Sequence, residues 1–327
     1  MNKKIIVAGI FLLVLIGAGI IYFFHPYFLY QTSNPTPTPA GPRKEPNQPL
    51  DLPGYQDYLG SLDRSKLQSL ASGIKVLERS IPNYSLEEAD QSFLAFNTFY
   101  IESLNHYNET FWQNENLNAK LKSATRNLSP SQAFEFLNTP SALQKDPEIK
   151  NLAQQVSSSG LILAVSEGGF YFSENPDFLY NRFSKYLSES LRGFLELRRH
   201  EAAEGFIGES GLQIPFAKIG ERIVAWEKYN EQYPDSPLKE LAGFQYQLYL
   251  GTFLFGIDNY KVFEEELLKP EIRKVYEDFA KKFVHTKSAN LINRYYHVLR
   301  VNDFKYTKAV ESFLSDNHVP VLPGLEP

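Results

Sequence analysis

The stretch Trp226-Glu-Lys-Tyr229-Asn-Glu-Gln-Tyr233-Pro-Asp-Ser236 decides the fold of this chain, because a matching stretch lies fifty residues later. The second copy reads Tyr276-Glu-Asp-Phe279-Ala-Lys-Lys-Phe283-Val-His-Thr286. Each copy carries three aromatic residues spaced three and four apart, which places them on one face of a helix. A hydroxyl residue then follows, the type that caps the start of a helix. The pattern predicts two helical hairpins whose aromatic faces form core rather than a ligand platform.

Helical signals continue through the residues that precede this repeat. Ser85 with Glu88 and Ser129 with Gln132 form predicted capping boxes, and proline stands in the first turn after Ser129, Asp146 and Asn175. The one short extended pattern is Phe170-Tyr-Phe172, so the sequence predicts an all-α domain. The expected helices lie at about 67–81, from 85 to about 111, from 129, from 146 to a stop at Gly168-Gly169, from 175 to about 187, and at 189–204.

Several residues of the C-terminal third bear on the type of helical array: Tyr229, Tyr233-Pro234-Asp235-Ser236-Pro237, Ala242, Tyr246, Tyr249-Leu250-Gly251 and Asn259-Tyr260. On these residues, the region of roughly 215–300 resembles the tetratricopeptide-like helical hairpins of bacterial cell-envelope proteins. The spacing is fifty residues rather than about thirty-four, and most small Ala positions are missing, so the array would be degenerate. The resemblance implies protein or peptide binding on a concave helical surface, and it implies no chemistry.

The N-terminus carries the signature of a membrane helix. Residues 5–24 contain no charged side chain, and a helix of that length spans about 30 Å, the thickness of a bilayer core. Lys3 and Lys4 precede this segment and the next basic residue is Arg43, so the N-terminus is predicted to be cytoplasmic and the bulk of the chain extracytoplasmic. A cleaved signal peptide is the alternative, with small residues Gly17 and Gly19 near a possible cleavage site.

The sequence thus divides into five predicted segments. They are a cytoplasmic stub at 1–4, a transmembrane helix at 5–24, a Pro-rich extracytoplasmic linker at 25–54, an all-α extracytoplasmic domain at 55–316 with a possible sub-boundary near 168–175, and a tail at 317–327. The linker is dense in proline, which blocks regular structure and favours an extended chain. We expect this linker to hold the domain away from the bilayer of a bacterial plasma membrane.

Composition excludes several kinds of chemistry. The chain has no cysteine, so it has no disulfide, thiol nucleophile or Cys-ligated metal site. Its net charge of −5 argues against a nucleic-acid surface. None of the six histidines pairs with another at helical spacing, and His200-Glu201-Ala-Ala-Glu204 is predicted to be a solvated polar helix face. The sequence therefore predicts no catalytic residue, no metal site and no cofactor.

Two further segments invite a functional interpretation. Glu209-Ser210-Gly211-Leu212-Gln213-Ile214 is similar to two strings of lytic transglycosylases, but the strings are fused here, so we expect a helix connection over 205–215. Gly168, Gly169, Phe170, Tyr171 and Phe172 form a candidate binding loop, since two glycines permit positive φ and three rings follow. The alternative is that two of the rings plug the core while Tyr171 is exposed.

Together these features predict a membrane-anchored extracytoplasmic scaffold or adaptor that binds a protein or peptide in the cell envelope. A ligand-binding or sensor ectodomain is the first alternative, and it would show one deep apolar cavity. An envelope enzyme without a recognised motif is the second, and it would bring carboxylates or histidines together in a cleft.

Overall fold

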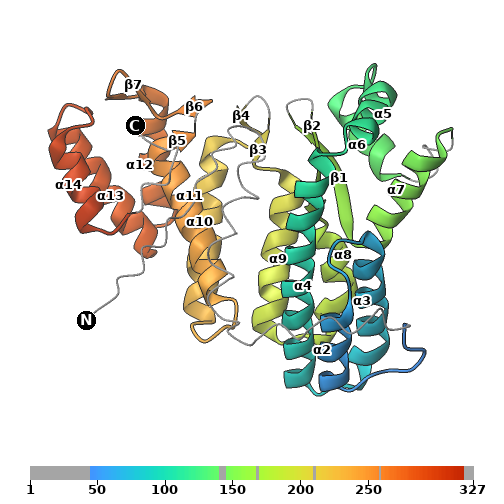
Figure 1. Ribbon diagram of the computed structural model, residues 1–327. Coiled ribbons are helices and arrows are strands. Elements are labelled where there is room, and N and C mark those ends of the chain that lie inside the picture. The colour runs from blue at the N-terminus through green and yellow to red at the C-terminus, as the bar shows by residue number, and fades with distance from the viewer. Residues whose placement is uncertain (1–44, 140–144, 167–168, 209–210, 258, 320–327) are drawn as a thin grey trace, which may run out of the picture.

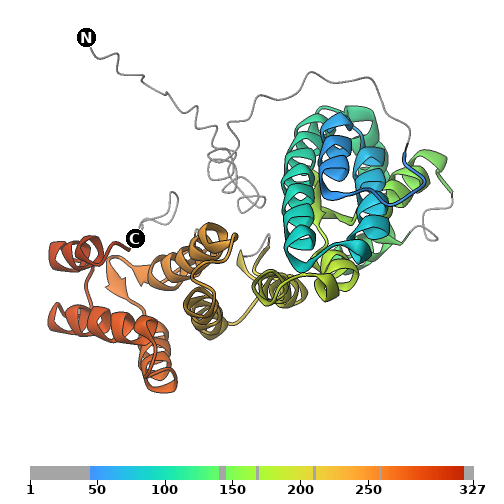
Figure 2. The same cartoon turned by 90° about the horizontal axis from the view of Figure 1, so that it is seen from below.

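The computed structural model describes residues 45–139, 145–166, 169–208, 211–257 and 259–319. Helices dominate these residues, as the sequence predicts, and Figure 1 shows them in two adjoining parts. We call α2–α9, together with the strand pair β1–β2, the N-terminal part, and α10–α14 the C-terminal part. In Figure 2 the helices follow a curved path from α2–α4 at one end to α12–α14 at the other.

The predicted membrane segment, residues 5–24, lies outside the described residues, as does most of the predicted linker. Within the described ranges, no helix has both the length and the apolar character that a membrane crossing requires. The chain is already packed from Glu45, whose carboxylate pairs with Arg79 at 3.5 Å, and the Leu50 amide donates to Ser80 Oγ at 2.9 Å. Packed structure is therefore present at Glu45, about ten residues before the expected boundary at residue 55.

The N-terminal part is built around a long central helix. Its helices are α2 (Leu52–Ser61), α3 (Leu67–Ser80), α4 (Leu86–Trp112), α5 (Glu115–Thr125), α6 (Pro130–Asn138), α7 (Pro147–Ser158), α8 (Pro176–Phe183) and α9 (Glu189–Glu204), with 3-10 turns η2 (Ile81–Asn83) and η3 (Ser184–Tyr186). The predicted capping boxes at Ser85 and Ser129 both form, and the side chains of Asp146 and Asn175 cap α7 and α8. The aromatic face of α4 is buried, with α2, α3 and β2 packed against this helix.

The expectation that the helix from 146 continues to Gly168 is wrong. The helix ends at Ser158, and Gly160 follows with φ of +67°, a conformation that favours glycine. The chain then forms β1 (Leu161–Ser166), which pairs antiparallel with β2 (Gly169–Glu174). Alternate residues of β1 face the core, Leu161 and Leu163 being almost fully buried. The sequence predicts a possible sub-boundary near 168–175. The described residues of that range include strand β2, which lies inside the N-terminal part, and this part continues to the end of α9.

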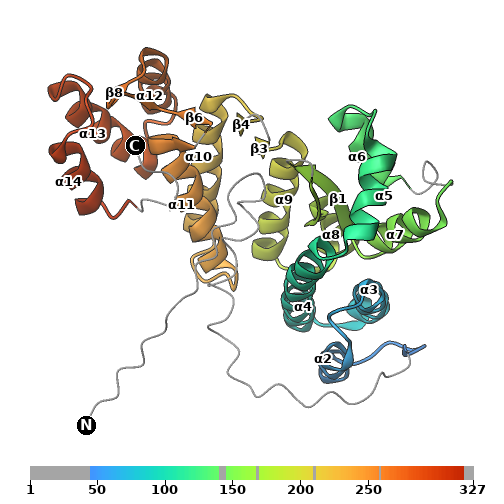
Figure 3. The same ribbon diagram turned by 45° about the horizontal axis from the view of Figure 1, so that its top comes forward.

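The C-terminal part consists of consecutive helices in pairs. Helices α10 (Phe216–Gln232) and α11 (Lys239–Phe255) form one hairpin, α12 (Pro270–Lys282) and α13 (Lys287–Val301) form the next, and α14 (Lys308–Asp316) packs on α13. Figure 3 shows α9 and α10 side by side where the two parts meet. Three pairs of two-residue strands connect the helices: β3 (Ile207–Gly208) with β4 (Gly211–Leu212), β5 (Gly256–Ile257) with β6 (Tyr260–Lys261), and β7 (Phe263–Glu264) with β8 (Leu267–Leu268).

The repeated aromatic stretches lie where the sequence places them, at the ends of α10 and α12. Trp226, Tyr229, Tyr276 and Phe279 are all buried, and each stretch leads through a short turn into the second helix of its hairpin. Thr286 caps α13 as expected, accepting from the Ala289 amide at 3.1 Å. The same expectation for Ser236 is wrong, because α11 begins at Lys239 without a side-chain cap. The prediction that these faces form core is confirmed for the described helices, whereas a tetratricopeptide-like array is not shown by this arrangement.

Candidate functional site

The predicted binding loop divides between the two faces of the strand pair. Phe170 and Phe172 point into the core, and the Phe172 ring packs against the ring of Phe111 with centroids 4.8 Å apart. Tyr171 lies on the opposite face, half-buried, where burial raises the pKa of its hydroxyl. Gly169 begins β2, and Gly168 lies outside the described residues. The two phenylalanine rings are therefore part of the packing of this hairpin against α4.

Two asparagines complete the hydrogen bonding of this strand pair. The Asn108 amide, from α4, accepts from the Phe172 N–H at 2.7 Å and donates to the Phe172 carbonyl at 3.0 Å. The Asn138 amide, from α6, bonds the N–H and carbonyl of Leu163 in the same way, at 2.8 and 2.9 Å. Leu163 and Phe172 are opposite each other in the register, so each outer edge of the pair is closed by one side chain.

The junction of α9 with α10 contains the most buried charged group of the described residues. Arg222 is 4% exposed, and its guanidinium contacts four partners, one of which is the Glu201 carbonyl at 3.3 Å. It donates to the Gly205 carbonyl at 2.6 Å, to the Tyr249 hydroxyl at 3.2 Å, and pairs with the Glu204 carboxylate at 3.1 Å. One turn further along α10, the indole N–H of Trp226 donates to Glu201 Oε1 at 2.5 Å. Side chains of α9, α10 and α11 thus meet at one point.

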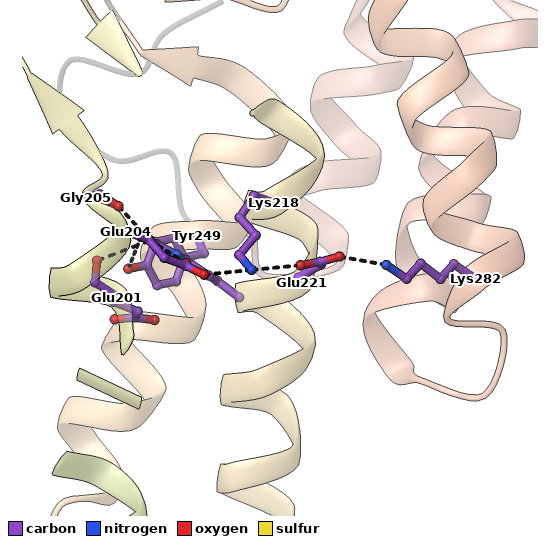
Figure 4. A network of polar contacts seen from close by, with 8 residues as sticks. Glu201, Glu204, Gly205, Lys218, Glu221, Tyr249 and Lys282 are labelled. Carbon is purple, nitrogen blue, oxygen red and sulfur yellow. Dashed lines mark hydrogen bonds and ion pairs between the residues drawn. The ribbon is translucent and has the colours of Figure 1, made fainter. Parts of the chain in front are cut away.

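An alternating row of charges extends from this junction to the second hairpin. Figure 4 shows Glu204, Lys218, Glu221 and Lys282 in sequence, reaching from α9 across α10 to α12. The three contacts measure 2.8, 3.1 and 2.7 Å in that order. The row joins the N-terminal part to both hairpins of the C-terminal part.

Burial and pairing move the pKa values of these carboxyl groups in opposite directions. Burial raises the pKa of Glu201, and the opposing effects of Arg198, Trp226 and Arg222 are smaller. The pKa of Glu204 is lowered, because its bonds to Lys218 and Arg222 together outweigh the cost of its desolvation. The bond to Lys282, supported by Lys218, lowers the pKa of Glu221.

A second contact between the hairpins is made by Glu227 of α10, a buried carboxylate. It accepts from the backbone amides of Lys287 and Ser288 at 2.6 and 2.9 Å, and from the Ser288 hydroxyl. These amides belong to the first turn of α13, where helix N–H groups lack partners and the helix dipole favours a negative charge. A neighbouring pair, Glu231 with Lys287 Nζ at 2.8 Å, is exposed. Glu227 therefore fixes the start of α13 against α10.

The charged side chains of the junction hold helices together. The junction carboxylates Glu201, Glu204, Glu221 and Glu227 all engage protein donors, which leaves each of them committed to a structural contact. Among the described residues, no group of three or more His, Asp or Glu side chains is placed to hold a metal ion.

The roles of Glu201 and Arg222 are not predicted by the sequence pattern. The prediction that 200–204 forms a solvated helix face is wrong for Glu201, which is partly buried and accepts a hydrogen bond from Trp226. Arg222 stands among apolar residues of α10, Ile219, Ile223 and Trp226. A charged residue on an otherwise apolar helical face was the one available signal of a buried ion pair.

Comparison with known proteins gives no relative: no family model, no curated protein and no solved structure matches this chain.

Proposed function

We propose that this protein is a membrane-anchored scaffold that binds a protein or peptide partner in the cell envelope through its helical hairpins. Residues 5–24 would anchor it in the plasma membrane of a bacterium, with the N-terminus inside and the helical domain extracytoplasmic. The Pro-rich linker would let the domain reach a partner away from the bilayer surface.

The observation that supports this proposal is the stacking of α10–α11 on α12–α13. Glu227 and the alternating row of charges hold the two hairpins in fixed relation, and Gly220 of α10 lets the Phe279 ring approach, since an added Cβ would lie 2.6 Å from that ring. Stacked hairpins present their outer helix faces as one extended surface, the arrangement that helical-repeat proteins use to bind partners. The burial of Phe170 and Phe172 also favours a scaffold over a receptor that binds a small molecule through these rings.

Affinity capture in the native host tests the proposal. The tagged full-length chain is crosslinked in cells, solubilised in mild detergent and purified, and the bound proteins are identified by mass spectrometry. Glu227→Ala removes the contact between the hairpins, and Glu231→Gln serves as the matched control because it removes only an exposed pair.

A scaffold predicts a partner that is recovered with the wild-type chain and with Glu231→Gln but reduced with Glu227→Ala. Recovery of no reproducible partner with the wild-type chain would contradict the scaffold. Equal recovery with all three chains would show that binding does not use the hairpin stack. Protease added to spheroplasts tests the topology, and it should digest the helical domain while the N-terminal segment stays with the membrane.

A further inference from the structure

Helix α13 differs in charge from the rest of this acidic protein. Its fifteen residues include Lys287, Arg294, His297 and Arg300 and no Asp or Glu. The net charge of the whole chain is −5. A helix without any carboxylate in a chain of that composition concentrates positive charge on one element, and its outer face attracts anionic partners.

The charged residues of α13 lie on its exposed face. Lys287, Arg294 and His297 are exposed, and their spacing of seven and three residues places them on one side of a helix. Arg300 is exposed beside them, and its guanidinium lies 3.2 Å from His297 Nδ1. Ile292, Tyr295 and Leu299, on the other side of the helix, are buried. Figure 1 places α13 and α14 at the end of the molecule opposite α5–α7.

Two of these cations have no acidic partner within the described part of the chain. Arg294 donates to Asn317 Oδ1 at 2.6 Å and lies over the Phe313 ring, so its side chain is positioned by neutral groups of α14. Within the described part of the chain, the Arg300 guanidinium has its side-chain hydrogen bond with the neighbouring His297. Lys287 differs, since it already pairs with Glu231. The guanidiniums of Arg294 and Arg300 are thus the charges that remain open to a carboxylate from another molecule.

Exposed apolar residues flank the charged face at both ends. Val301, the last residue of α13, is 65% exposed, and Val284, in the turn before α13, is 63% exposed. They are the two most exposed of the large hydrophobic residues in the described ranges. The helix between them is about 20 Å long at 1.5 Å per residue. A ligand that matches this face carries negative charge in its middle and apolar groups at its ends.

We propose that the outer face of α13 binds an acidic peptide segment of a partner protein, with Arg294 and Arg300 pairing to its carboxylates and Val284 and Val301 contacting apolar residues at its ends. This inference rests on the proposed scaffold function and specifies the face and the chemistry of the partner. The exposed valines favour a peptide over a phosphate polymer or a lipid headgroup, because those ligands offer no apolar side chains at this spacing.

Fluorescence anisotropy on the full-length chain in a neutral detergent tests this proposal. The probe is a labelled synthetic peptide with leucine at both ends and glutamate between them, and the control peptide has glutamine at the glutamate positions. We expect the acidic peptide alone to bind, with an affinity that falls as NaCl rises from about 50 to 300 mM. The double variant Arg294→Gln with Arg300→Gln should lower the affinity about tenfold, as expected for two partly exposed charge pairs.

The matched control is Lys122→Gln with Arg126→Gln, which removes two exposed cations at α5 in the N-terminal part. It changes the net charge equally and should leave peptide binding unchanged. Thermal melting followed by circular dichroism checks that each variant is folded, and Arg300→Gln alone provides a second variant that leaves the contact of Arg294 with α14 intact. Equal binding of the two peptides, or wild-type affinity in both the double variant and Arg300→Gln, would overturn the proposal.

Two further arms separate this inference from its alternatives. Polyphosphate, or vesicles containing phosphatidylglycerol, should not compete with the peptide, and competition at equal charge concentration would overturn the assignment to a peptide. The same double variant is used in affinity capture from cells. If it retains the partner that the wild-type chain captures, the α13 face is not the binding site although the scaffold stands, whereas failure of the wild-type chain to capture any partner contradicts the scaffold itself.

Discussion

The two parts of the molecule are held together by different means. In the N-terminal part, a buried strand pair is closed by two neutral amides, and aromatic rings from α4 fill the space around it. In the C-terminal part, aromatic rings also pack between the helices, and carboxylates are added at the joints: Glu227 at the start of α13, and the alternating row that runs from Glu204 of α9 to Lys282. The N-terminal part encloses its strand pair in one core, whereas the C-terminal part joins its helical hairpins one after another.

This difference has a consequence for how each part responds to change. A core that surrounds a strand pair loses many contacts when one residue is removed, because its neighbours share that residue. The same holds for the rings between the C-terminal helices, whereas the charged contacts at the joints add a contribution to stability that depends on pH and salt. The predictions below test this contrast, starting with the largest expected effect.

Trp226→Ala should destabilise the protein most. The indole is fully buried at the junction. Its ring centroid lies 5.3 Å from that of Phe194 in α9 and 5.6 Å from that of Tyr229. Removal of a buried aromatic side chain costs about 3–5 kcal/mol, and here Glu201 also loses its donor. Urea unfolding followed by circular dichroism measures the loss, and a change below about 1 kcal/mol would mean that the junction is not a packed core.

Asn108→Ala should lower the free energy of unfolding by about 2–4 kcal/mol, because the buried N–H and carbonyl of Phe172 lose their hydrogen-bond partner. The matched control is Asn118→Ala, which removes an amide that donates to the carbonyls of Phe111 in α4 and Asn114 at the start of α5. Hydrogen exchange should show faster exchange of the Phe172 amide in Asn108→Ala alone. Unchanged protection of that amide would contradict the role of Asn108 in closing the strand edge.

The elements of this fold that the sequence predicts correctly depend on residues close together in the chain. The caps at Ser85, Ser129, Asp146 and Asn175 could be predicted because a cap and its amide lie within about three residues. The aromatic hairpins could be predicted for a similar reason, since their periodicity is local.

The parts that were missed depend on partners far apart in the chain. Asn108 bonds to a residue 64 positions away, and Glu201 meets an indole 25 positions away. Residues 161–165 fall within the predicted helix that ends at Gly168-Gly169, but Leu161-Ile-Leu-Ala-Val165 is a short apolar run, and such a run does not by itself distinguish a strand from a buried helix segment. The tertiary contact with Asn138 and the turn at Gly160 decide its conformation.

The pH dependence of stability should separate Glu201 from Glu204. The pKa of Glu201 is raised in the folded state, so the native protein binds this proton more tightly and its contribution to stability falls as pH rises from the unfolded value of 4.5 through the folded one. The pKa of Glu204 is lowered, so its contribution is present above 4.5 and is lost as pH falls through the folded value.

Glu201→Gln should therefore reduce the decline of stability above pH 4.5, and Glu204→Gln should reduce the loss of stability below it. Urea unfolding at a series of pH values measures both. If the two variants shift the pH profile in the same direction, the opposed environments of these carboxyl groups are contradicted.

The smallest effect is expected at the exposed pair of Glu231 with Lys287. Both side chains are largely in water, so Glu231→Gln should change the free energy of unfolding by about 0–0.5 kcal/mol. Glu227→Ala, four residues earlier, should cost about 2–3 kcal/mol because it strips two helix amides of their acceptor. Equal effects of the two substitutions in urea unfolding would contradict the claim that Glu227 holds the start of α13 while Glu231 forms only a surface pair.

Photo-crosslinking in living cells tests the central claim of a binding surface on the hairpin stack most directly. A photoreactive amino acid is placed at His297, on the exposed face of α13, and at Asp57, which is exposed on α2 in the N-terminal part. The account predicts one discrete crosslinked product from position 297 that disappears in the double variant Arg294→Gln with Arg300→Gln, and none of that size from position 57. A product from position 57 alone, or no product from either position, would contradict it.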